Sequence, residues 1–340
     1  MAGPAPTLSI CIATFNRAKY IGQTLECLLA QLLPAVEIVI LDSSTSDETE
    51  RVVRVFGEGV SQLRYFRQAE NHGIDHDFDR AVQLATGEFC WLMSDDDILR
   101  DGAVRRVLAS LRPERTLIIV NAEVADHDLS RTLEPRRLQV QADRTYGTSD
   151  LDRLLRDTGQ YITFIGCIII RRSVWLVRDR RSYYGSLFIH VGVIFQSPLP
   201  GETLLLAEPL VRIRYGNATW RAREFEIWMF KWPGLIWSMS AISASAKAQV
   251  CPPEPWRELK KLLALRAKGA YSLREYRRWI EPRGASFEVR LRARAVALIP
   301  GPLANAIALL YYWTAGRRSR LSLYDARNSR YYFRNWLRAP

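Results

Sequence analysis

Short apolar segments alternate with amphipathic ones over the first third of the chain, and this alternation constrains the fold more than any other feature. After Asn16, apolar residues recur at helical spacing (Ile21, Leu25, Leu28, Leu32), and a second such face ends at Gly87. The apolar runs themselves fall at residues 7–14, 36–42, 63–67 and 88–93. Buried strands joined by helices predict an α/β fold with a mostly parallel sheet covered by helices on both faces.

Carboxylates follow two of these expected strands. Asp42 ends the second, and Asp95, Asp96 and Asp97 come directly after the fourth. In open parallel sheets, ligands bind beyond the carboxyl ends of the strands. Adjacent carboxylates repel one another, and a folded chain has no structural need for three in a row. Carboxylate oxygens are typical ligands of Mg²⁺ or Mn²⁺ held against phosphates, so the pattern predicts a divalent cation bound beside a diphosphate.

Ordinary structural explanations exist for the same residues. The acidic triplet could be a solvated loop or a helix cap, Asp42 could form an Asx turn, and Asn16 could cap the first helix. A simple turn would account for the segment at 71–73, and surface polarity at a helix start, rather than a metal cluster, for His72, Asp75, His76 and Asp77. These explanations do not account for the order of the acids along the sheet.

The character of the chain changes in its second half. Residues 115–215 are rich in strand patterns, and from about residue 220 the chain becomes helical and rich in Trp and Arg, so we expect domains at 1–220 and 221–340. Residues 251–340 contain 19 Lys and Arg against 6 Asp and Glu, a net charge of +13. Because the whole chain has a net charge of +12, residues 1–250 together carry −1. Any attraction to an anionic surface therefore belongs to the C-terminal quarter.

One stretch near the C-terminus, residues 295–316, is apolar enough to enter a membrane. Pro300, Gly301 and Pro302 divide it into halves too short to span a bilayer. Arginines flank both halves, and Tyr311, Tyr312 and Trp313 lie at one boundary. This pattern is typical of a helix or helical hairpin that lies in the lipid interface.

The cysteines and the N-terminus favour a cytoplasmic location. The five cysteines lie mostly in apolar runs, so we expect them to be buried thiols of a protein in a reducing compartment. The first apolar stretch lacks a basic segment before it and begins a strand, so no signal peptide is expected. With the basic tail, we expect a cytoplasmic protein bound peripherally to the inner face of the cell membrane.

Four motifs taken in order resemble glycosyltransferase family 2. They are ATFNR (13–17), ILDSSTSDET (40–49), NHGIDHDFDRAVQLATGE (71–88) and GEFCWLMSDDD (87–97). The resemblance implies inverting sugar transferases with the Rossmann-like GT-A fold, a nucleotide-diphosphate sugar donor and a divalent metal, Mn²⁺ or Mg²⁺. The S-D-D-D sequence and His190 are similar to the abequosyltransferase-like branch, which builds O-antigen or capsule repeats.

The resemblance also implies site residues. Asp42 is expected to contact the nucleotide base, Asp97 to bind the metal directly, and Asp95 to contact the ribose or the metal through water. The division of roles among the three acids stays open, because the family's L-D-x-D-D pattern aligns here in two ways. The full set expected at the donor is Thr14, Asn16, Arg17, Asp42, Ser44, Asn71, Gly73, Asp95, Asp96, Arg214 and Asn217, with Asp95 and Asp97 on the metal. Of these, Arg214 and Asn217 do not come from the resemblance. They follow the last expected strand, where together with Arg212 they could reach the diphosphate or form a lid over the donor. A strand end with a Gly-Asn turn is the alternative.

The catalytic base departs from the family pattern. The family usually supplies an acid at a helix start after the middle strands, but no acid lies between Asp179 and Glu202. His190 stands at about the expected place, and imidazole can accept a proton near neutral pH. A packed histidine in an apolar helix is the alternative. Asp179 is the next candidate, although neighbouring arginines would lower its basicity.

A basic interfacial tail on a catalytic domain predicts an acceptor in the membrane, such as a glycan on polyprenyl diphosphate. Two other functions are compatible with parts of the sequence. A nucleotidyltransferase would use the same metal, but ATFNRAKYIG poorly matches a glycine-rich phosphate loop. A non-enzymatic membrane or nucleic-acid binder would use aromatic residues among arginines, as in RYYFRNWLR (330–338).

Overall fold

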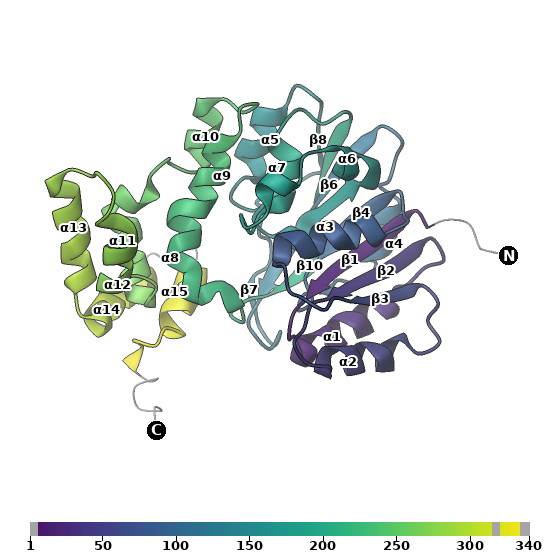
Figure 1. The fold of residues 1–340 in the computed structure, drawn as a ribbon, viewed down its shortest axis with the longest axis horizontal. Helices are drawn as coiled ribbons and strands as arrows, with labels where there is room; N and C mark the ends of the chain where they lie inside the picture. The colour runs from purple at the N-terminus through teal and green to yellow at the C-terminus, as the bar shows by residue number, and fades with distance from the viewer. Residues whose placement is uncertain (1–5, 315–319, 334–340) are drawn as a thin grey trace. The chain divides into compact units, whose positions relative to one another are not determined.

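The computed structural model describes residues 6–314 and 320–333, which form two compact units (Figure 1). Of these residues, the first unit comprises 6–215 and 239–250, and the second comprises 216–238, 251–314 and 320–333. The sequence places a boundary at residue 220, close to this division, but gives no sign that residues 239–250 return to the first unit. The segment 330–338 noted above lies partly outside the described residues.

A ten-stranded mixed sheet forms the centre of the first unit, in the order β3-β2-β1-β4-β9-β6-β10-β5, with β7 on β6 and β8 on β10. The strands are β1 (Leu8–Thr14), β2 (Val36–Asp42), β3 (Leu63–Arg67), β4 (Phe89–Met93), β5 (Ile98–Leu99), β6 (Arg115–Ala125), β7 (Thr132–Glu134), β8 (Arg144–Tyr146), β9 (Ile168–Arg171) and β10 (Glu202–Arg214). The expected α/β class and the first four strands are confirmed.

Parallel pairing joins β1 to β2 and β4, β2 to β3, and β6 to β10. Strand β9 is antiparallel to both β4 and β6, so β4 and β6 point the same way. The carboxyl ends of β1, β2, β4, β6 and β10 therefore share one edge of the sheet. Within the strand-rich region 115–215, the apolar run at 161–170 is a strand only at its end, because residues 165–167 form a 3₁₀ turn.

The helices of the first unit are α1 (Ala18–Leu29), α2 (Glu48–Gly57), α3 (Ile74–Leu84), α4 (Ala103–Leu108), α5 (Leu151–Thr158), α6 (Arg172–Val177), α7 (Ile189–Phe195) and α10 (Ala244–Val250). Helices α1 and α2 pack on each other, whereas α3 packs on β1 and β2. Right-handed crossovers require this arrangement, because the chain moves from β1 outward to β3 and then returns past β1 to β4. The crevice between β1 and β4, where the order reverses, is the usual ligand position in such sheets.

The second unit is helical. Its helices are α8 (Glu224–Glu226), α9 (Trp232–Ser238), α11 (Leu259–Lys268), α12 (Leu273–Glu275), α13 (Phe287–Leu298), α14 (Gly301–Thr314) and α15 (Arg320–Arg327). Aromatic residues dominate its core, where the rings of Phe225 and Tyr271 stack with centroids 4.8 Å apart. Lys268 joins three helices, since its ammonium lies 2.6 Å from Asp325 and 3.8 Å from Glu224.

No single helix among the described residues has both the length and the apolar character needed to cross a membrane. Taken together, α13 and α14 meet those criteria, but the chain bends by 94° between them.

Candidate functional site

The ends of β1, β2 and β4 bring the predicted donor residues together. Thr14 is paired with Asp42 in the register of β1 and β2, and Met93, two residues before Asp95, is paired with Ile12. Asp42 and the acidic triplet therefore lie at the same sheet edge, on either side of β1. The sequence-based expectation that the acids gather at one edge is met by this geometry.

Arg17 lies in the middle of this group. Its Nε is 3.2 Å from Oδ1 of Asp95, and its guanidinium also pairs with Asp96. The Tyr20 ring supports the guanidinium at 4.5 Å, a cation–π contact made one turn into α1. Asn16 directs the chain into this position with a φ of 55°, a left-handed conformation that Asn tolerates better than most residues.

Burial and mutual repulsion raise the pKa values of Asp95 and Asp97 in the acidic triplet. Burial and the charge of Asp96 raise the pKa of Asp95 to about 7, although Arg17 acts in the opposite direction. Burial, followed by the same neighbouring charge, raises the pKa of Asp97 as well. Asp95 and Asp97 are 7% and 2% exposed. Closely spaced buried carboxylates with raised pKa values favour an additional cation.

Hydrogen bonds fix the loop that carries the triplet. The amide of Arg214, at the end of β10, donates to Oδ1 of Asp97 at 2.7 Å, and the Ser94 hydroxyl donates to Oδ2 at 2.8 Å. The Thr24 hydroxyl, on α1, bonds the backbone oxygens of Asp95 and Asp97 at 3.1 and 2.9 Å. The loop is thus held by two elements that are far apart in sequence.

Thr24 and Gln23 were missed by sequence reasoning. The Arg214 guanidinium donates to the Asp96 backbone oxygen at 2.9 Å and to the Gln23 side chain at 2.6 Å. Thr24 is fully buried among the apolar residues of α1. The sequence did contain a sign of the role of Thr24: its hydroxyl lies on the apolar face of a predicted helix, and a buried hydroxyl needs a hydrogen-bond partner.

Asp42 is fully buried and both of its carboxylate oxygens are bonded. Oδ1 accepts from the Ser44 amide at 2.7 Å, the Asx-turn geometry, and Oδ2 accepts from the Tyr65 hydroxyl at 2.7 Å. The Ser44 hydroxyl accepts from the Asn16 amide at 2.8 Å, which joins the β1 and β2 loops. A contact from Asp42 to a nucleotide base stays a prediction.

The remaining donor candidates are Asn71, Gly73 and Asn217. Asn71 is exposed and accepts from the Gly73 amide at 2.8 Å, as an ordinary turn would. Gly73 has a φ of 94°, which favours glycine, and precedes the first residue of α3. Asn217 falls in the second unit. Roles for these three residues at the donor stay predictions.

The acids of α3 are buried, contrary to the expectation of surface polarity at 75–77. Asp75, Asp77 and Asp79 are 3%, 2% and 1% exposed. Asp75 accepts from the amides of Leu187 and Ile189 at 2.8 and 3.0 Å, whereas Asp77 bonds Ser43. Surface polarity was the wrong interpretation for Asp75 and Asp77, because each carboxylate holds a separate segment against α3, whereas His72 is exposed as expected.

The His190 side chain is buried, so a sugar acceptor would have little access to it. Its side chain is 1% exposed, its Nε2 lies 2.7 Å from the Ile162 carbonyl oxygen, and burial lowers its pKa to about 4. Its helix nevertheless starts beside the first turn of α3, near the donor edge, through the bonds to Asp75. The assignment of His190 as base stays a prediction, and packing explains its present environment.

Asp179 is exposed on the loop after α6. Hydrogen bonds from Ser182 lower its pKa, which makes it a weaker base. Its neighbour Arg180 pairs with Asp79, near the middle of α3. The catalytic assignment of Asp179 also stays a prediction.

The triplet offers the oxygen ligands that a hard cation requires, since carboxylate oxygens suit Mg²⁺ and Mn²⁺. Arg17 already places a cation on Asp95 and Asp96. Within residues 6–314 and 320–333, no group of three or more His, Cys, Asp and Glu side chains is arranged to hold a metal by itself. A metal at this edge would therefore need Arg17 to move and substrate oxygens to complete its coordination.

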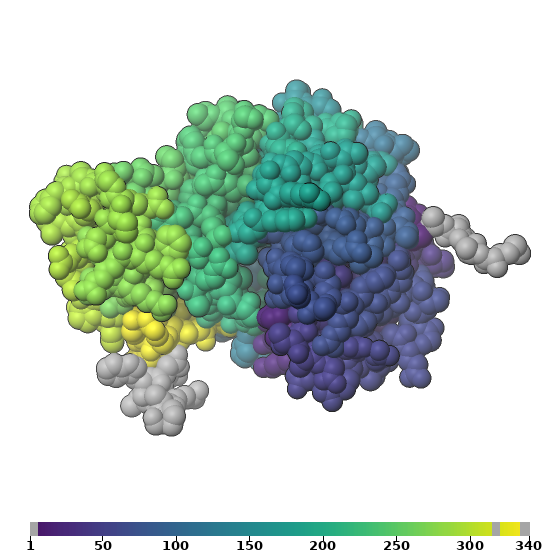
Figure 2. Space-filling view, in the orientation of Figure 1, coloured from purple at the N-terminus to yellow at the C-terminus, as the bar shows by residue number. Residues whose placement is uncertain are grey.

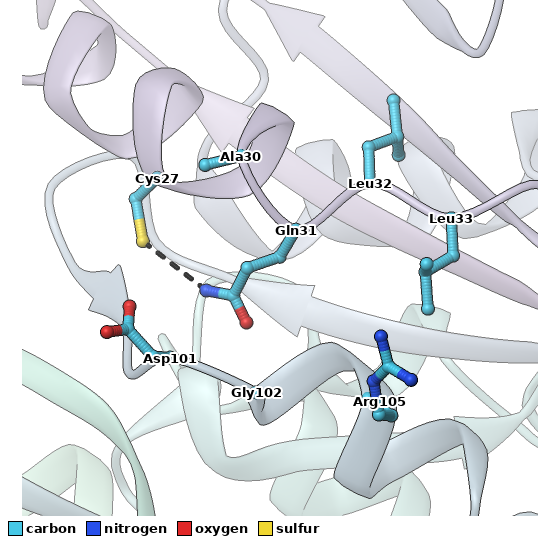
Figure 3. A pocket seen from close by; sticks show the side chains of 8 residues that line it. All are labelled: Cys27, Ala30, Gln31, Leu32, Leu33, Asp101, Gly102 and Arg105. Atoms are coloured by element: carbon cyan, nitrogen blue, oxygen red, sulfur yellow. Dashed lines mark hydrogen bonds between the residues drawn. The ribbon is translucent and has the colours of Figure 1, made fainter.

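A cavity of about 390 Å³ lies at the other end of α1 (Figure 3). It is lined by Cys27, Ala30, Gln31, Leu32, Leu33, Asp101, Gly102 and Arg105. The Cys27 thiol is directed to the Leu99 carbonyl oxygen at 3.0 Å, and none of the predicted donor residues lines the cavity.

Comparisons of the sequence with known proteins find glycosyltransferases. The sequence profile described as Glycosyl transferase family 2 matches residues 9–176. Abequosyltransferase RfbV of Salmonella typhimurium is 26% identical over 223 residues, which cover 62% of this chain and 67% of that protein. The GalNAc(5)-diNAcBac-PP-undecaprenol beta-1,3-glucosyltransferase of Campylobacter jejuni is 29% identical over 104 residues, only 30% of this chain and 34% of that protein.

Solved structures share the fold. Staphylococcus aureus TarS 1-349 has a TM-score of 0.57 at 16% identity, with 94% of this chain and 89% of that chain covered. The mannosyltransferase PcManGT of Pyrobaculum calidifontis, in complex with GDP-Man and Mn²⁺, has a TM-score of 0.52 at 15% identity, with coverage of 95% and 86%.

Proposed function

We propose that the chain, whose residues 9–176 match glycosyl transferase family 2, transfers one sugar from a nucleotide-diphosphate donor, with inversion, to a lipid-linked glycan. The observation that carries this proposal is the meeting of Asp42 and Asp95–Asp97 at the carboxyl ends of β2 and β4, on either side of β1. A diphosphate placed in that crevice would face the acids and Arg17.

A divalent metal is proposed to be held by Asp95 and Asp97, together with the donor's phosphates. When bound, such an ion neutralises the negative charge that develops on the departing diphosphate. Support comes from the raised pKa values of both carboxyls, caused mainly by burial, and from a neighbour of the same fold solved with Mn²⁺. Arg17, released from the acids, could then pair with a phosphate oxygen.

The proposed acceptor is a glycan on polyprenyl diphosphate, in the synthesis of a cell-surface polysaccharide. The Campylobacter relative acts, by its name, on an undecaprenyl diphosphate glycan. The charge of +13 on residues 251–340 also suits a protein bound peripherally to an anionic membrane on its cytoplasmic face. Hexosyl or deoxyhexosyl transfer is the proposed subtype.

The proposed base is His190, with Asp179 as the second candidate. The helix of His190 begins beside the first turn of α3. Burial lowers the pKa of His190 to about 4, which keeps the ring neutral at pH 7 but also makes it a weaker base than an exposed histidine. Its ring would have to leave the Ile162 carbonyl to reach an acceptor hydroxyl. General bases of this kind contribute about 10² to 10⁴ in rate.

A thermal-shift panel with UDP, GDP, CDP and dTDP, each with and without Mn²⁺, tests the donor site. We expect one nucleotide to raise the melting temperature in a Mn²⁺-dependent way, and Asp97→Ala to abolish that rise. Glu114→Ala is the matched control, because Glu114 is exposed and precedes β6 at the opposite sheet edge. The absence of a shift with any nucleotide would contradict the proposal, as would an equal loss in the Glu114 variant.

A further inference from the structure

Helix α14 is turned with its small and polar residues toward the protein and its large apolar residues toward solvent. Gly301, Ala304 and Asn305 are buried. Leu303, Ile307 and Leu310 are 53%, 60% and 65% exposed. A surface helix of a soluble domain shows the opposite arrangement. Packing within this unit therefore does not explain these apolar side chains.

The rotation of α14 about its axis is fixed. The Asn305 side-chain amide donates to the carbonyl oxygens of Ala267 and Ala326 at 3.0 and 2.9 Å. A Cβ at Gly301 would lie 2.4 Å from the Tyr331 ring, so only glycine allows this close approach. By helical spacing, Leu303, Ile307 and Leu310 lie on the side opposite Asn305. The outward apolar face is therefore built into the fold.

Helix α13 repeats this arrangement. It buries Ala293, Val296 and Ala297, and exposes Phe287, Leu291 and Leu298 at 72%, 54% and 57%. We call the exposed residues Phe287, Leu291, Leu298, Leu303, Ile307, Leu310, Tyr311 and Trp313 the apolar face. The surface of both helices belongs to the yellow-green part of the second unit in Figure 2.

Charge around the apolar face identifies its partner. Helices α13 and α14 carry three arginines, Arg290, Arg292 and Arg294, and one acidic residue, Glu288, which pairs with Arg292. Arg292 and Arg294 are exposed on α13, beside its apolar residues. A layer of anionic lipid headgroups complements this charge, whereas a second copy of the chain would bring the same positive residues into opposition.

The geometry fits insertion into the interface of a bilayer. A helix of 14 residues such as α14 is roughly 21 Å long, shorter than the hydrocarbon core of about 30 Å. Tyr311 and Trp313, 65% and 71% exposed, lie at its C-terminal end, and such residues favour the headgroup level. The 94° bend places α13 across α14.

We propose that the apolar face inserts into the headgroup region of an anionic lipid bilayer, with Arg292 and Arg294 against the lipid phosphates. The contact itself is independent of catalysis. Its purpose rests on the proposed function, since it would hold the enzyme at the surface where a lipid-linked acceptor resides.

Flotation of the full-length protein with vesicles of phosphatidylcholine, with and without phosphatidylglycerol, tests the proposal. The wild type is expected to float with the anionic vesicles. The double variant Ile307→Glu, Leu310→Glu should bind roughly tenfold more weakly or worse, because it places charge in the apolar layer. The matched control Val55→Glu, Val177→Glu changes residues 73% and 83% exposed in the first unit and should bind as the wild type does.

Failure of the wild type to bind anionic vesicles, or unchanged binding by the double variant, would overturn the proposal. So would light scattering that finds a dimer dissociated by the substitutions while vesicle binding persists, since the face would then join two copies. Thermal melting checks folding, and Ile307→Ala, Leu310→Ala replaces the glutamate variant if that one does not fold. Nucleotide binding, measured without vesicles, tests the proposed function separately.

Discussion

The guanidinium of Arg17 lies 3.2 Å from the carboxylate of Asp95, so the acidic loop after β4 has an internal counter-ion. The two side chains are 13% and 9% exposed, which makes this pair more buried than most ion pairs of the chain. The residue just before α1 and one after β4 are thereby joined across the crevice in which parallel sheets bind their ligands.

Replacement of Arg17 by Met should lower the free energy of unfolding by about 2 kcal/mol, because two largely buried carboxylates lose their partner. Mn²⁺ should raise the melting temperature more in this variant than in the wild type, since the ion no longer competes with the guanidinium. Chemical denaturation and differential scanning fluorimetry measure the two effects.

Arg51→Met is the control for this experiment. Its pair with Asp47 is exposed at 66% and 67%, and pairs of that kind contribute roughly 0–1 kcal/mol. Equal destabilisation in both variants, or a smaller Mn²⁺ effect without Arg17, would show that Arg17 does not occupy a cation position.

Asp97→Asn should separate the structural role of Asp97 from cation binding. The Asn oxygen can still accept from the Arg214 amide, so the melting temperature should stay within a few degrees of the wild type. A neutral amide binds divalent cations more weakly, so the Mn²⁺-dependent shift with nucleotide should be lost. If Asp97→Asn keeps that shift, residues other than Asp97 bind the metal.

Asp75→Asn should loosen the start of α7. The carboxylate accepts from two backbone amides, and Asn offers only one acceptor oxygen, so we expect a loss of about 1–2 kcal/mol in unfolding free energy. Hydrogen exchange should accelerate at residues 187–189. Asp128→Asn, in an exposed turn where the carboxylate accepts from the Ser130 amide, is the control and should change stability by less than about 0.5 kcal/mol.

His190 should make stability depend on pH. Burial lowers its pKa from 6.5 to about 4, so the unfolded state takes up a proton first as the pH falls. The contribution to stability is constant above about pH 6.5 and decreases by about 3 kcal/mol toward pH 4. His190→Gln should lack this part of the pH dependence in urea denaturation.

Turnover measured on the same variant decides the catalytic assignment of His190. A kcat lowered by about 10² to 10⁴ with an unchanged KM would support His190 as the base. A kcat close to the wild type would leave packing as its role and make Asp179→Asn the next variant to measure. The same pH dependence of stability in the wild type and in His190→Gln would contradict the buried, neutral state, since the opposite effect of the raised pKa of Asp95 is present in both proteins.

Periodicity and local chemistry were sufficient to predict a large part of the molecule. The runs at 36–42 and 63–67 became β2 and β3 with the same bounds, because an apolar run between turn residues has few alternatives to a buried strand. The placement of Asp42 and Asp97 at one edge followed from parallel pairing alone. The partners of Asp97 did not, because Arg214 and Thr24 lie far from it in sequence.

The sequence by itself determined the strand–helix alternation, the sheet edge that carries the acids and the positive C-terminal quarter, since each depends on composition or short-range spacing. Only the tertiary structure decided which carboxylates are bonded and which way α14 faces. Asp75 and Asp77 look like solvated helix-start residues in the sequence, yet they are buried against segments from elsewhere in the chain. Burial and hydrogen bonding depend on neighbours in space, and local sequence does not specify those neighbours.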